Sequence, residues 1–591
     1  MFATYRELKN MIKYFGLGCV VFFVSAYFLK QYQSSPVTEE KEFHVNSFVL
    51  SEVSDKVGLI HSHKKEGIHP SLKNVEPWLT SVGSGVAISD VNNDGFQDIF
   101  LCNTHRAQSN FFYQNNGDGT FSERAHELGL GDINRPYPCV RPMFFDVDQD
   151  GRQDFFMGTT YCPKLFLQSK EGRFVDVTEK SGIGKGCVYS MASTFIDFDD
   201  DGKQDLIVAG YFPAVDLFSP NTTKVMQENI TGAKNGGPSF FYRNNGNGTF
   251  TDITSQINIE LKGWVIAIGV YDLNYDGKPD LWFAVDFNKN KVFLNVGKAK
   301  FRDVSSSMSN ELSRSGMSVD IEDVEADQKP LAYVSQIYEP SNNVKGNQLW
   351  KFFGAEKISD LADAQNVIRC GWSWGTKFID FDNDSYEDLV VANGFISANP
   401  KKAYWYNLMQ INATRKNVIS DAKNWADMSD FSLAGYQKDC LYYNDRGHFR
   451  NIASQTAFND FELDGRSVSR IDFLNNGSLG LVISNQSQKT LFFENKQTNK
   501  NQWIGFNLLS QKGMSPVYGA QVQIELAGKK RVKQSFYLNG FSSQNDPRIH
   551  FGLGSAKKVD KIVVKWPNGI SEEIGNLELN KYHDLRQGSI D

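Results

Sequence analysis

Asp90-Val-Asn92-Asn-Asp94-Gly95-Phe-Gln-Asp98 is the first of five closely related nine-residue stretches in this chain. The other four are Asp146-Val-Asp148-Gln-Asp150-Gly151-Arg-Gln-Asp154, Asp197-Phe-Asp199-Asp-Asp201-Gly202-Lys-Gln-Asp205, Asp272-Leu-Asn274-Tyr-Asp276-Gly277-Lys-Pro-Asp280 and Asp380-Phe-Asp382-Asn-Asp384-Ser385-Tyr-Glu-Asp388. Positions 1, 3, 5 and 9 carry a carboxylate or an amide, and position 6 is Gly in four of the five. Calcium takes about six to eight oxygen ligands, and glycine permits the sharp turn that gathers them. The stretches therefore predict calcium-binding loops.

An EF-hand begins with the same spacing and is the main alternative. It requires Glu at position 12 and a helix on each side. Here position 12 is Leu101, Met157 and Val208 in the first three copies, and the flanks, such as Ile99-Phe-Leu, are typical of strands. A plain Asp/Gly turn between two strands would explain a single copy, but five nearly regular copies favour metal binding. We therefore expect each loop to join two strands and to close on the Asp at position 9.

Two further copies are degenerate. Asp323-Val-Glu325-Ala-Asp327-Gln328 lacks the Gly and has Leu at position 9, and Asp472-Phe-Leu-Asn-Asn476-Gly477 has Leu at position 3 and Gly at position 9. We predict about five calcium sites, with a sixth candidate at Asp323, Glu325 and Asp327. The predicted metal ligands are Asp90, Asn92, Asp94, Asp98, Asp146, Asp148, Asp150, Asp154, Asp197, Asp199, Asp201, Asp205, Asp272, Asn274, Asp276, Asp280, Asp380, Asp382, Asp384 and Asp388.

The spacing of these loops predicts the fold. They start at residues 90, 146, 197, 272, 323, 380 and 472, which defines seven units. Each unit also holds an aromatic hairpin such as Phe111-Phe-Tyr-Gln-Asn-Asn-Gly117, where Asn-Gly is a strong turn signal. Four short strands per unit indicate a seven-bladed β-propeller over residues 43–498, and the strand near 43–53 is expected to complete the last blade. Longer spacings mark insertions at 213–237, 339–365 and 398–435, the last partly helical.

The segment after the repeats has a different pattern. Val517-Tyr-Gly-Ala-Gln-Val-Gln-Ile-Glu and Lys561-Ile-Val-Val-Lys-Trp566 are typical of strands. Residues 501–588 are therefore predicted to form a small C-terminal all-β module. The predicted fold class is all-β, a seven-bladed propeller with this module and an N-terminal membrane-anchor helix.

The N-terminus predicts the location of the protein. Arg6, Lys9 and Lys13 precede an apolar run from Tyr14 to Leu29. This length lies between a signal-peptide core and a full span, and no clear small-residue cleavage site follows. We predict a cytoplasmic tail at 1–13, a transmembrane anchor or signal segment at 14–30 and a linker at 31–42. The bulk would then be extracytoplasmic on a single-pass membrane protein, or secreted if the segment is cleaved.

Composition and cysteines limit the choices further. The net charge of −7 and the lack of a basic stripe argue against nucleic acid as a partner. Six of the seven cysteines follow the anchor, and an even number permits disulfides without assigning them. Cys139 and Cys162 flank one predicted hairpin, which makes that pair one candidate.

At this point the chain resembles a known family. The repeats resemble FG-GAP/VCBS repeats, which are found in the calcium-binding propellers of integrin α-subunits. The run Ser543-Gln-Asn-Asp-Pro-Arg548, followed by His550-Phe-Gly-Leu-Gly554 and Val564-Lys-Trp-Pro-Asn-Gly569, resembles the ASPIC/UnbV domain. Together they are similar to the cartilage acidic protein family. The resemblance implies a calcium-loaded extracellular propeller with a C-terminal ASPIC/UnbV module that acts in adhesion or binding.

Three functions are compatible with these observations. The first is a membrane-anchored, calcium-stabilised binding, adhesion or scaffold protein with a protein or carbohydrate ligand. The second is a lyase-like carbohydrate-active enzyme, and the third is an accessory role in a biosynthetic or export assembly. We favour the first and predict no enzyme, because the sequence has no nucleophile elbow, HExxH or Walker motif. His61, His63 and His69 could form a metal cluster or a polar loop, and Trp372 and Trp374 could line a sugar channel or pack in the interior.

Overall fold

The structure is a computed structural model that describes residues 43–309, 315–339, 344–413, 418–512 and 514–588. The chain divides into two compact units, residues 1–45 and 46–591, and the architecture below is that of the second. The predicted tail, anchor and linker at 1–42 lie outside the described residues. Within the described ranges, no helix is both long enough and apolar enough to cross a membrane.

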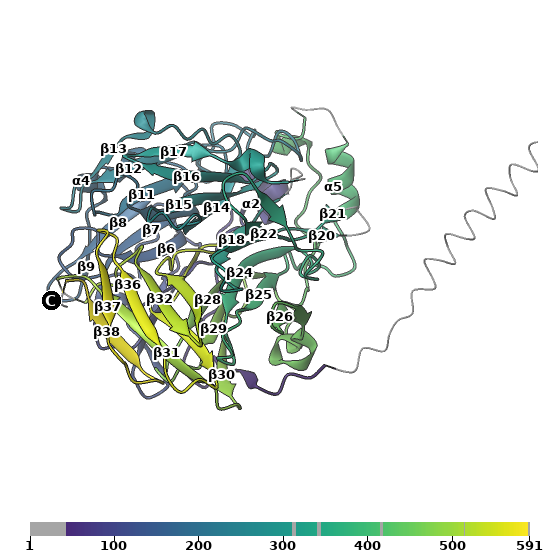
Figure 1. Cartoon of the computed structure of the whole chain (residues 1–591). Coiled ribbons are helices and arrows are strands. Elements are labelled where there is room, and N and C mark those ends of the chain that lie inside the picture. The colour runs from purple at the N-terminus through teal and green to yellow at the C-terminus, as the bar shows by residue number, and fades with distance from the viewer. Residues whose placement is uncertain (1–42, 310–314, 340–343, 414–417, 513, 589–591) are drawn as a thin grey trace, which may run out of the picture. The chain divides into compact units, whose positions relative to one another are not determined.

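The repeats fold into seven separate antiparallel sheets in the described part of the chain (Figure 1). Sheets one to three are β2 (Val86–Ser89), β3 (Asp98–Leu101), β4 (Phe111–Asn115), β5 (Phe121–Glu123); β6 (Cys139–Phe145), β7 (Asp154–Thr159), β8 (Lys164–Gln168), β9 (Phe174–Asp176); and β10 (Ala192–Ile196), β11 (Asp205–Ala209), β12 (Ser239–Asn244), β13 (Phe250–Asp252). Sheets four and five are β14 (Trp264–Tyr271), β15 (Asp280–Asp286), β16 (Lys291–Gly297), β17 (Lys300–Asp303); and β18 (Ser318–Glu322), β19 (Leu331–Ser335), β22 (Gln348–Phe352), β23 (Ile358–Asp360). Sheets six and seven are β24 (Ser373–Ile379), β25 (Asp388–Asn393), β26 (Cys440–Asn444), β27 (Phe449–Asn451); and β28 (Gly465–Ile471), β29 (Gly480–Asn485), β30 (Leu491–Gln497), β1 (Phe48–Glu52).

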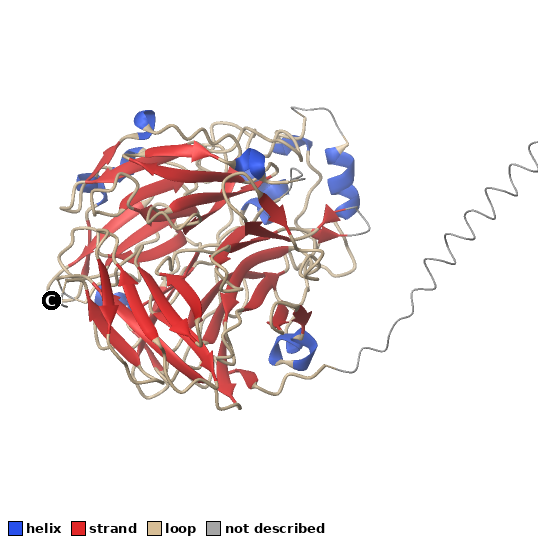
Figure 2. Cartoon of the chain, viewed as in Figure 1, coloured by secondary structure: helices blue, strands red, loops and turns tan. Residues whose placement is uncertain are grey.

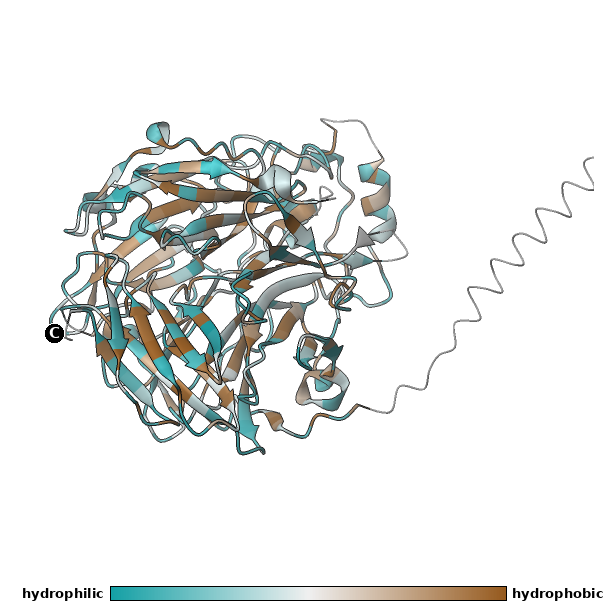
Figure 3. Ribbon diagram, viewed as in Figure 1, coloured by the Kyte–Doolittle hydropathy of each residue, from teal (hydrophilic) through white to brown (hydrophobic). Residues whose placement is uncertain are grey.

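Burial changes systematically from the first strand of a sheet to the last. All eight residues of β14 are buried, whereas in β17, the last strand of the same sheet, only Phe301 is buried and the other three residues are exposed. Every residue of the first and second strands is buried because the sheet is covered on both faces, and some first strands, such as β28, bury polar side chains as well. Figure 3 shows these hydrophobic segments along the strands of the second unit. The predicted all-β fold is confirmed, and Figure 2 shows strands throughout with few and short helices.

The first strands of neighbouring sheets pack against each other. Contacts join β2 to β6, β10 to β14, β14 to β18, β18 to β24 and β24 to β28, and β28 also contacts β2. Each sheet remains open, and no sheet in the described residues closes on itself. The contact between β28 of sheet seven and β2 of sheet one nevertheless brings the last sheet next to the first.

The N-terminal strand completes the last sheet, as predicted. β1 pairs antiparallel with β30, and Phe48 lies opposite Gln497 while Glu52 lies opposite Phe493. Strands more than 440 residues apart in the sequence therefore share one sheet. This pairing ties the start of the repeat region to its end.

The remaining elements are short. The helices are α2 (Glu76–Leu79), α3 (Ala125–Leu128), α4 (Thr178–Ser181) and α5 (Trp405–Asn412), with 3₁₀ turns η1 (Pro70–Val75), η2 (Ile183–Lys185), η3 (Thr254–Gln256), η4 (Ser305–Ser307), η6 (Ala422–Asn424), η7 (Ala453–Gln455) and η8 (Ala457–Asp460). A small hairpin pairs β20 (Tyr338–Glu339) with β21 (Val344–Lys345). α5 lies in the insertion 398–435, where the sequence predicted helix.

Residues 501–588, the C-terminal module, form two sheets around a core of their own. One sheet holds β31 (Gln502–Leu509), β35 (Ile549–Gly554) and β38 (Tyr582–Arg586), and the other holds β32 (Gln521–Leu526), β33 (Lys529–Gln534), β36 (Lys561–Lys565) and β37 (Ser571–Ile574). Ile504, Phe506, Val522 and Phe551 are among the buried residues between them. The predicted all-β character of this stretch is confirmed.

One part of the module lies among the repeat sheets instead of in its own sheets. Residues 537–546, the central segment, are all buried, and the segment contains β34 (Ser543–Gln544), which pairs in parallel with β2. It contacts the first strands of six sheets through these pairs: Ser543 with Val86, Gln544 with Phe144, Asn539 with Val270, Gly540 with Val319, Phe541 with Trp374 and Asn545 with Arg470. Because inner strands expose backbone groups on their free edge, these contacts satisfy groups that would otherwise be buried and unpaired.

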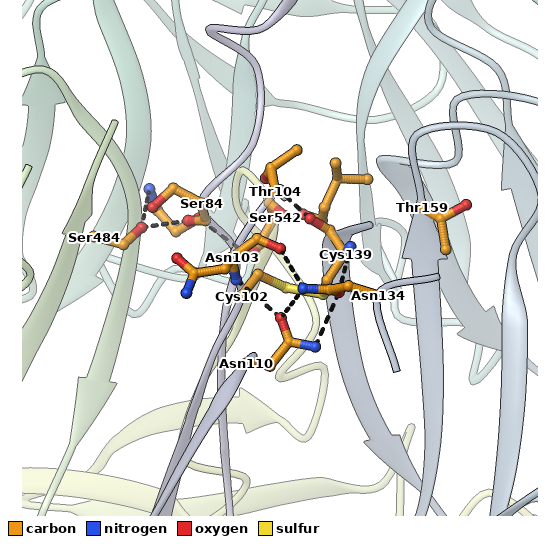
Figure 4. The surroundings of a disulfide bond; sticks show 12 residues. Ser84, Cys102, Asn103, Thr104, Asn110, Asn134, Cys139, Thr159, Ser484 and Ser542 are labelled. Atoms are coloured by element: carbon orange, nitrogen blue, oxygen red, sulfur yellow. Dashed lines mark hydrogen bonds between the residues drawn. A yellow bond between two sulfur atoms is a disulfide. The ribbon is translucent and has the colours of Figure 1, made fainter. Parts of the chain in front are cut away.

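The described residues form three disulfides. They join Cys102 to Cys139, Cys162 to Cys187 and Cys370 to Cys440. The predicted Cys139–Cys162 pair is wrong, because Cys139 begins β6 and lies beside the end of β3 in the preceding sheet. Figure 4 shows this junction, where the Asn134 side-chain oxygen accepts from the Cys139 N–H at 3.0 Å and from the Asn110 amide at 3.0 Å. The first two bonds thus connect neighbouring repeats.

Candidate metal centres

All seven acidic loops occupy the same place in their sheets. Loop one (residues 90–98), loop two (146–154), loop three (197–205), loop four (272–280), loop five (323–331), loop six (380–388) and loop seven (472–480) each connect the first strand to the second. Position 1 directly follows the first strand, and position 9 is the first residue of the second strand. The predicted strand–loop–strand arrangement is confirmed, and the EF-hand alternative does not apply.

The loops also share one backbone conformation. The residue at position 4 has positive φ in every loop, from 54° at Ala326 to 64° at Asp200. Position 6 has positive φ as well, 89° at Gly95, 81° at Ser385 and 57° at Gln328. Glycine suits this region, while Gln328 carries the strain of a side chain in it. Thus loops five and seven retain the turn even though their predicted ligand sets are incomplete.

The carboxylate at position 1 holds the turn together. In loop one, the N–H groups of Asp94 and Gly95 donate to the two oxygens of Asp90 at 3.1 and 2.8 Å. The corresponding pair of hydrogen bonds occurs in all seven loops, including loop five, where both distances to Asp323 are 3.2 Å. Position 1 therefore has a structural role that does not depend on a metal.

The carboxylate at position 9 links the loop to the third strand. Asp98 accepts from the N–H of Val91 at 3.0 Å and from that of Asn115, in β4, at 2.9 Å. Loops two, three, four and six have equivalent bonds. These hydrogen bonds leave the remaining lone pairs of each carboxylate available, since a carboxylate has about four acceptor sites. The sequence did not reveal this second role of position 9.

Three loops gather carboxylates closely enough for one ion. The groups are Asp146, Asp148 and Asp154; Asp197, Asp199 and Asp205; and Asp380, Asp382 and Asp384, each with one oxygen per residue within 4.8 Å of the others. Two oxygens that bind the same calcium ion are at most about 5 Å apart. Asp199 also has a buried oxygen, Oδ1, without a hydrogen-bond partner. An all-oxygen set with this spacing fits a hard cation such as calcium.

Loops one and four have an amide at position 3. The Asn92 amide donates to Asp94 Oδ2 at 2.7 Å, and the Asn274 amide donates to Asp276 Oδ2 at 3.0 Å. The side-chain oxygens of these asparagines accept from the N–H at position 5 at 3.3 and 3.1 Å. In both loops the amide at position 3 is thus hydrogen-bonded to the residue at position 5.

The loop carboxylates have unusual protonation equilibria without a cation. Burial raises the pKa of Asp154 and of Asp205 to about 8, and neighbouring carboxylates contribute. The position 1 groups Asp90, Asp146, Asp197 and Asp272 have pKa values raised to about 6, again chiefly by burial. A bound cation would favour the charged forms, so protons and metal should compete for these loops.

The C-terminal module lies against several loops. Gln521 donates to Asp272 Oδ2 at 2.7 Å, and Gln534 accepts from the Asp272 N–H at 2.8 Å. At loop six, Ser385 donates to the Gly552 carbonyl at 2.6 Å. At loop seven, Tyr582 donates to Asp472 Oδ2 at 3.0 Å. Sequence reasoning missed these residues, although Gly552 belongs to the His-Phe-Gly-Leu-Gly run that it singled out.

Other candidate residues are used structurally. His61 Nδ1 lies 2.7 Å from Thr490 Oγ1, and His63 Nδ1 accepts from the Ser487 N–H at 3.1 Å. The His69 side chain caps the first turn of η1. These three histidines do not belong to any of the metal-compatible groups found among the described residues. Trp372 and Trp374 are 3% and 1% exposed, so both side chains pack in the interior instead of lining an open channel.

Comparison with known proteins gives consistent results. Residues 90–157, 146–208 and 229–283 match the FG-GAP-like repeat model, and residues 510–590 match the ASPIC and UnbV model. Cartilage acidic protein 1 of Xenopus tropicalis is 22% identical over 400 residues, which cover 55% of this chain and 59% of that protein. The Homo sapiens protein of the same name is 22% identical over 398 residues, covering 55% and 58%. The chain thus spans less than two thirds of the length of these relatives.

Similar solved structures were also found. A lectin of Agrocybe aegerita that recognises non-reducing terminal N-acetylglucosamine has a TM-score of 0.38 and 14% identity, covering 69% of this chain and 87% of that one. BBS1N in complex with ARL6DN has a TM-score of 0.37 and 7% identity, covering 71% and 94%. Such low scores define neither the fold nor a ligand. The two family matches, together with the loops described above, show that this chain carries FG-GAP-like repeats followed by an ASPIC/UnbV domain.

Proposed function

We propose that the seven sheets are the blades of a β-propeller and that loops one, two, three, four and six each bind one calcium ion as a structural element. The observation that carries this proposal is the common backbone of the loops, together with the carboxylate oxygens that loops two, three and six gather within one turn. Clustered carboxylates repel one another when charged, and a divalent cation relieves that repulsion. The packing of sheet seven on sheet one and the central segment among the inner strands support the closed ring.

The protein as a whole would act as an extracytoplasmic binding or adhesion protein. Residues 14–30 would anchor it in a membrane, and its partner would be a protein or a carbohydrate recognised without catalysis. The similarity to cartilage acidic protein 1 and the FG-GAP-like repeats, which resemble those of integrin-like binding proteins, support a binding role. The metals would stabilise the scaffold that displays the binding surface. Carboxylates saturated by calcium are poor general bases, so the loops themselves would not perform catalysis.

The test is elemental analysis of the full-length chain, purified in mild detergent, with thermal melts in calcium and in EDTA. We expect about five calcium ions per chain and a melting temperature that falls strongly in EDTA, because calcium binds only the folded loops. Pull-downs in calcium, with EDTA as the control, would then identify partners. The assignment would be contradicted by a stoichiometric amount of zinc, iron or copper in place of calcium, together with a melting temperature that EDTA does not change.

A further inference from the structure

Loops five and seven keep the turn of the other loops but each holds a basic side chain. Lys351, from β22, points into loop five, and Arg548, from the C-terminal module, lies on loop seven. We propose that the Lys351 side chain takes the place of calcium in loop five by binding Glu325 and Asp327, and that the Arg548 side chain, itself paired with Asp546, occupies the turn of loop seven. This inference rests on the proposed calcium loading of the other five loops.

In loop five, the ammonium takes a position between two predicted ligands. Lys351 Nζ is 2.5 Å from Glu325 Oε2 and 2.8 Å from Asp327 Oδ2. The Lys351 side chain is only 7% exposed, so this is a largely desolvated contact. Charge-assisted N–H···O bonds of this kind are about 2.7–2.9 Å long, and they leave no room for a second cation between the same oxygens.

The strand register explains why Lys351 reaches this loop. Leu331 stands at position 9, where the complete loops have Asp, and it pairs directly with Lys351 across β19 and β22. The repeat has therefore lost a carboxylate at one strand position and gained a cation at the position opposite.

In loop seven a side chain from outside the repeat occupies the turn. It retains a single carboxylate, Asp472, of the four predicted ligand positions. Arg548 donates to the Asp472 carbonyl at 2.9 Å and to Asn475 Oδ1 at 2.5 Å, and its side chain is 4% exposed. Asp546 fixes the guanidinium through bonds of 2.9 and 2.6 Å. A rigid, planar guanidinium suits such a buried, multiply bonded position better than a hydrated metal ion.

The two types of loop differ in chemistry as well as in sequence. Calcium requires about six to eight oxygen ligands, whereas an ammonium needs three acceptors and a guanidinium five. A loop with fewer carboxylates can therefore be neutralised by a side chain without any ion from solution. Loops five and seven would remain formed at calcium concentrations that empty the others.

The test uses loop five in the full-length chain. The double variant Leu331→Asp with Lys351→Gln restores the carboxylate at position 9 and removes the ammonium, and we expect elemental analysis to find one more calcium ion than in the wild type. The single variant Lys351→Met leaves Glu325 and Asp327 uncompensated, and its melting temperature in EDTA should fall by about 4 °C or more. Lys329→Met is the matched control, since Lys329 is 3.6 Å from the same Asp327 but 47% exposed, and it should change neither value.

The outcomes separate this inference from the proposed function. A wild-type chain that binds six or seven calcium ions, or a Lys351→Met chain that melts in EDTA as the wild type does, would overturn the substitution by side chains. A wild-type chain without calcium would overturn the proposed function instead, and the Lys351→Met melt in EDTA would still test the ammonium. If the double variant does not fold, the wild-type calcium count together with the single variant decides the matter.

Discussion

Loops three and six present nearly the same carboxylates in different surroundings. In loop three Asp199, at position 3, is half-buried, and a surface lysine, Lys203, pairs with the exposed Asp201 at position 5. In loop six Asp382 is only 2% exposed, and the C-terminal module covers the turn through the Ser385–Gly552 bond. His550 adds a contact of 2.6 Å to Asn383.

The difference shows that one motif can serve two structural purposes. A cation in loop three would stabilise one turn of one sheet. A cation in loop six would also hold together sheet six and the C-terminal module, because both parts contribute to its enclosure. Burial and the nearby Asp384 and Glu387 carboxylates hold the pKa of Asp380 well above its usual range, whereas the pKa of Asp197 rises only to about 6. The buried loop therefore depends more on neutralisation than the exposed one.

The largest effect is expected at the contact between Gly552 and loop six. A Cβ atom at Gly552 would lie 2.0 Å from Asp380 Oδ2 and 2.6 Å from the Asn383 Cα. Gly552→Val should therefore separate the module from loop six and cost about 3 kcal/mol or more of unfolding free energy. Chemical denaturation measures this cost. Gly575→Val is the control, because no atom lies within 4 Å of its Cβ position; equal losses in the two variants would show that loop six is not a joint.

The next effect concerns the lysine beside each loop. Lys533, from β33 of the C-terminal module, pairs with Glu387 of loop six, and the two side chains are 13% and 7% exposed. Lys203 pairs with Asp201 in loop three, and these side chains are 29% and 31% exposed. Lys533→Met leaves a buried carboxylate unpaired and should cost about 3 kcal/mol. Lys203→Met should cost less than about 1 kcal/mol. Denaturation of both variants in EDTA tests this, and a larger loss for Lys203→Met would reverse the comparison.

Removing one predicted ligand from each loop compares the two ions directly. Asp382→Ala should lower stability by about 2.7 kcal/mol at a calcium concentration about a hundredfold above the dissociation constant. Asp199→Ala should lower it less, because water can replace the lost ligand in the more open loop. Calorimetric melts in calcium give both values. In EDTA the same variants should be no less stable than the wild type, since each removes a repelling charge; unchanged melts in calcium would eliminate the structural role of the metals.

A separate effect is expected from pH. In the metal-free protein the folded-state pKa of Asp205 is about 8, far above the unfolded value of about 3.9. The folded state then binds more protons than the unfolded state between these pH values, so stability is highest below about pH 4 for this group and falls as pH rises to 8. We expect the melting temperature in EDTA to fall by about 5 °C from pH 5 to pH 8, and the effect of added calcium to grow over the same range. Asp205→Asn should flatten the trend in EDTA, and a melting temperature that rises with pH would contradict the sign.

The loops were predictable because their chemistry depends on local spacing. A single copy can be recognised by its oxygen ligands at positions 1, 3, 5 and 9 and by the glycine that a positive φ favours at position 6. The regular repetition of these copies then indicates the sheets. The strand that closes sheet seven was predictable for the same reason, since a repeat missing its last strand must obtain it elsewhere. These features require no knowledge of distant contacts.

Features that depend on distant contacts were not predictable. The central segment, Lys351 in loop five and the disulfide partners each depend on which residues neighbouring sheets bring together. The candidate Cys139–Cys162 pair assumed bonding within one hairpin, whereas the bonds of both cysteines cross to another sheet. Similarly, Gly552 shows no local requirement for glycine, because its constraint is the distance to Asp380.

The position of the central segment has a consequence for synthesis of the chain. Residues 537–546 leave the ribosome after every repeat sheet has been made, yet they pair with β2, whose residues appear near the start. At about 5–20 residues per second, the inner strands wait for tens of seconds before their last partners arrive. During that time their edges can pair with other nascent chains. A stop codon or a stalled ribosome before residue 537 would therefore leave an aggregation-prone product, although every repeat would be present.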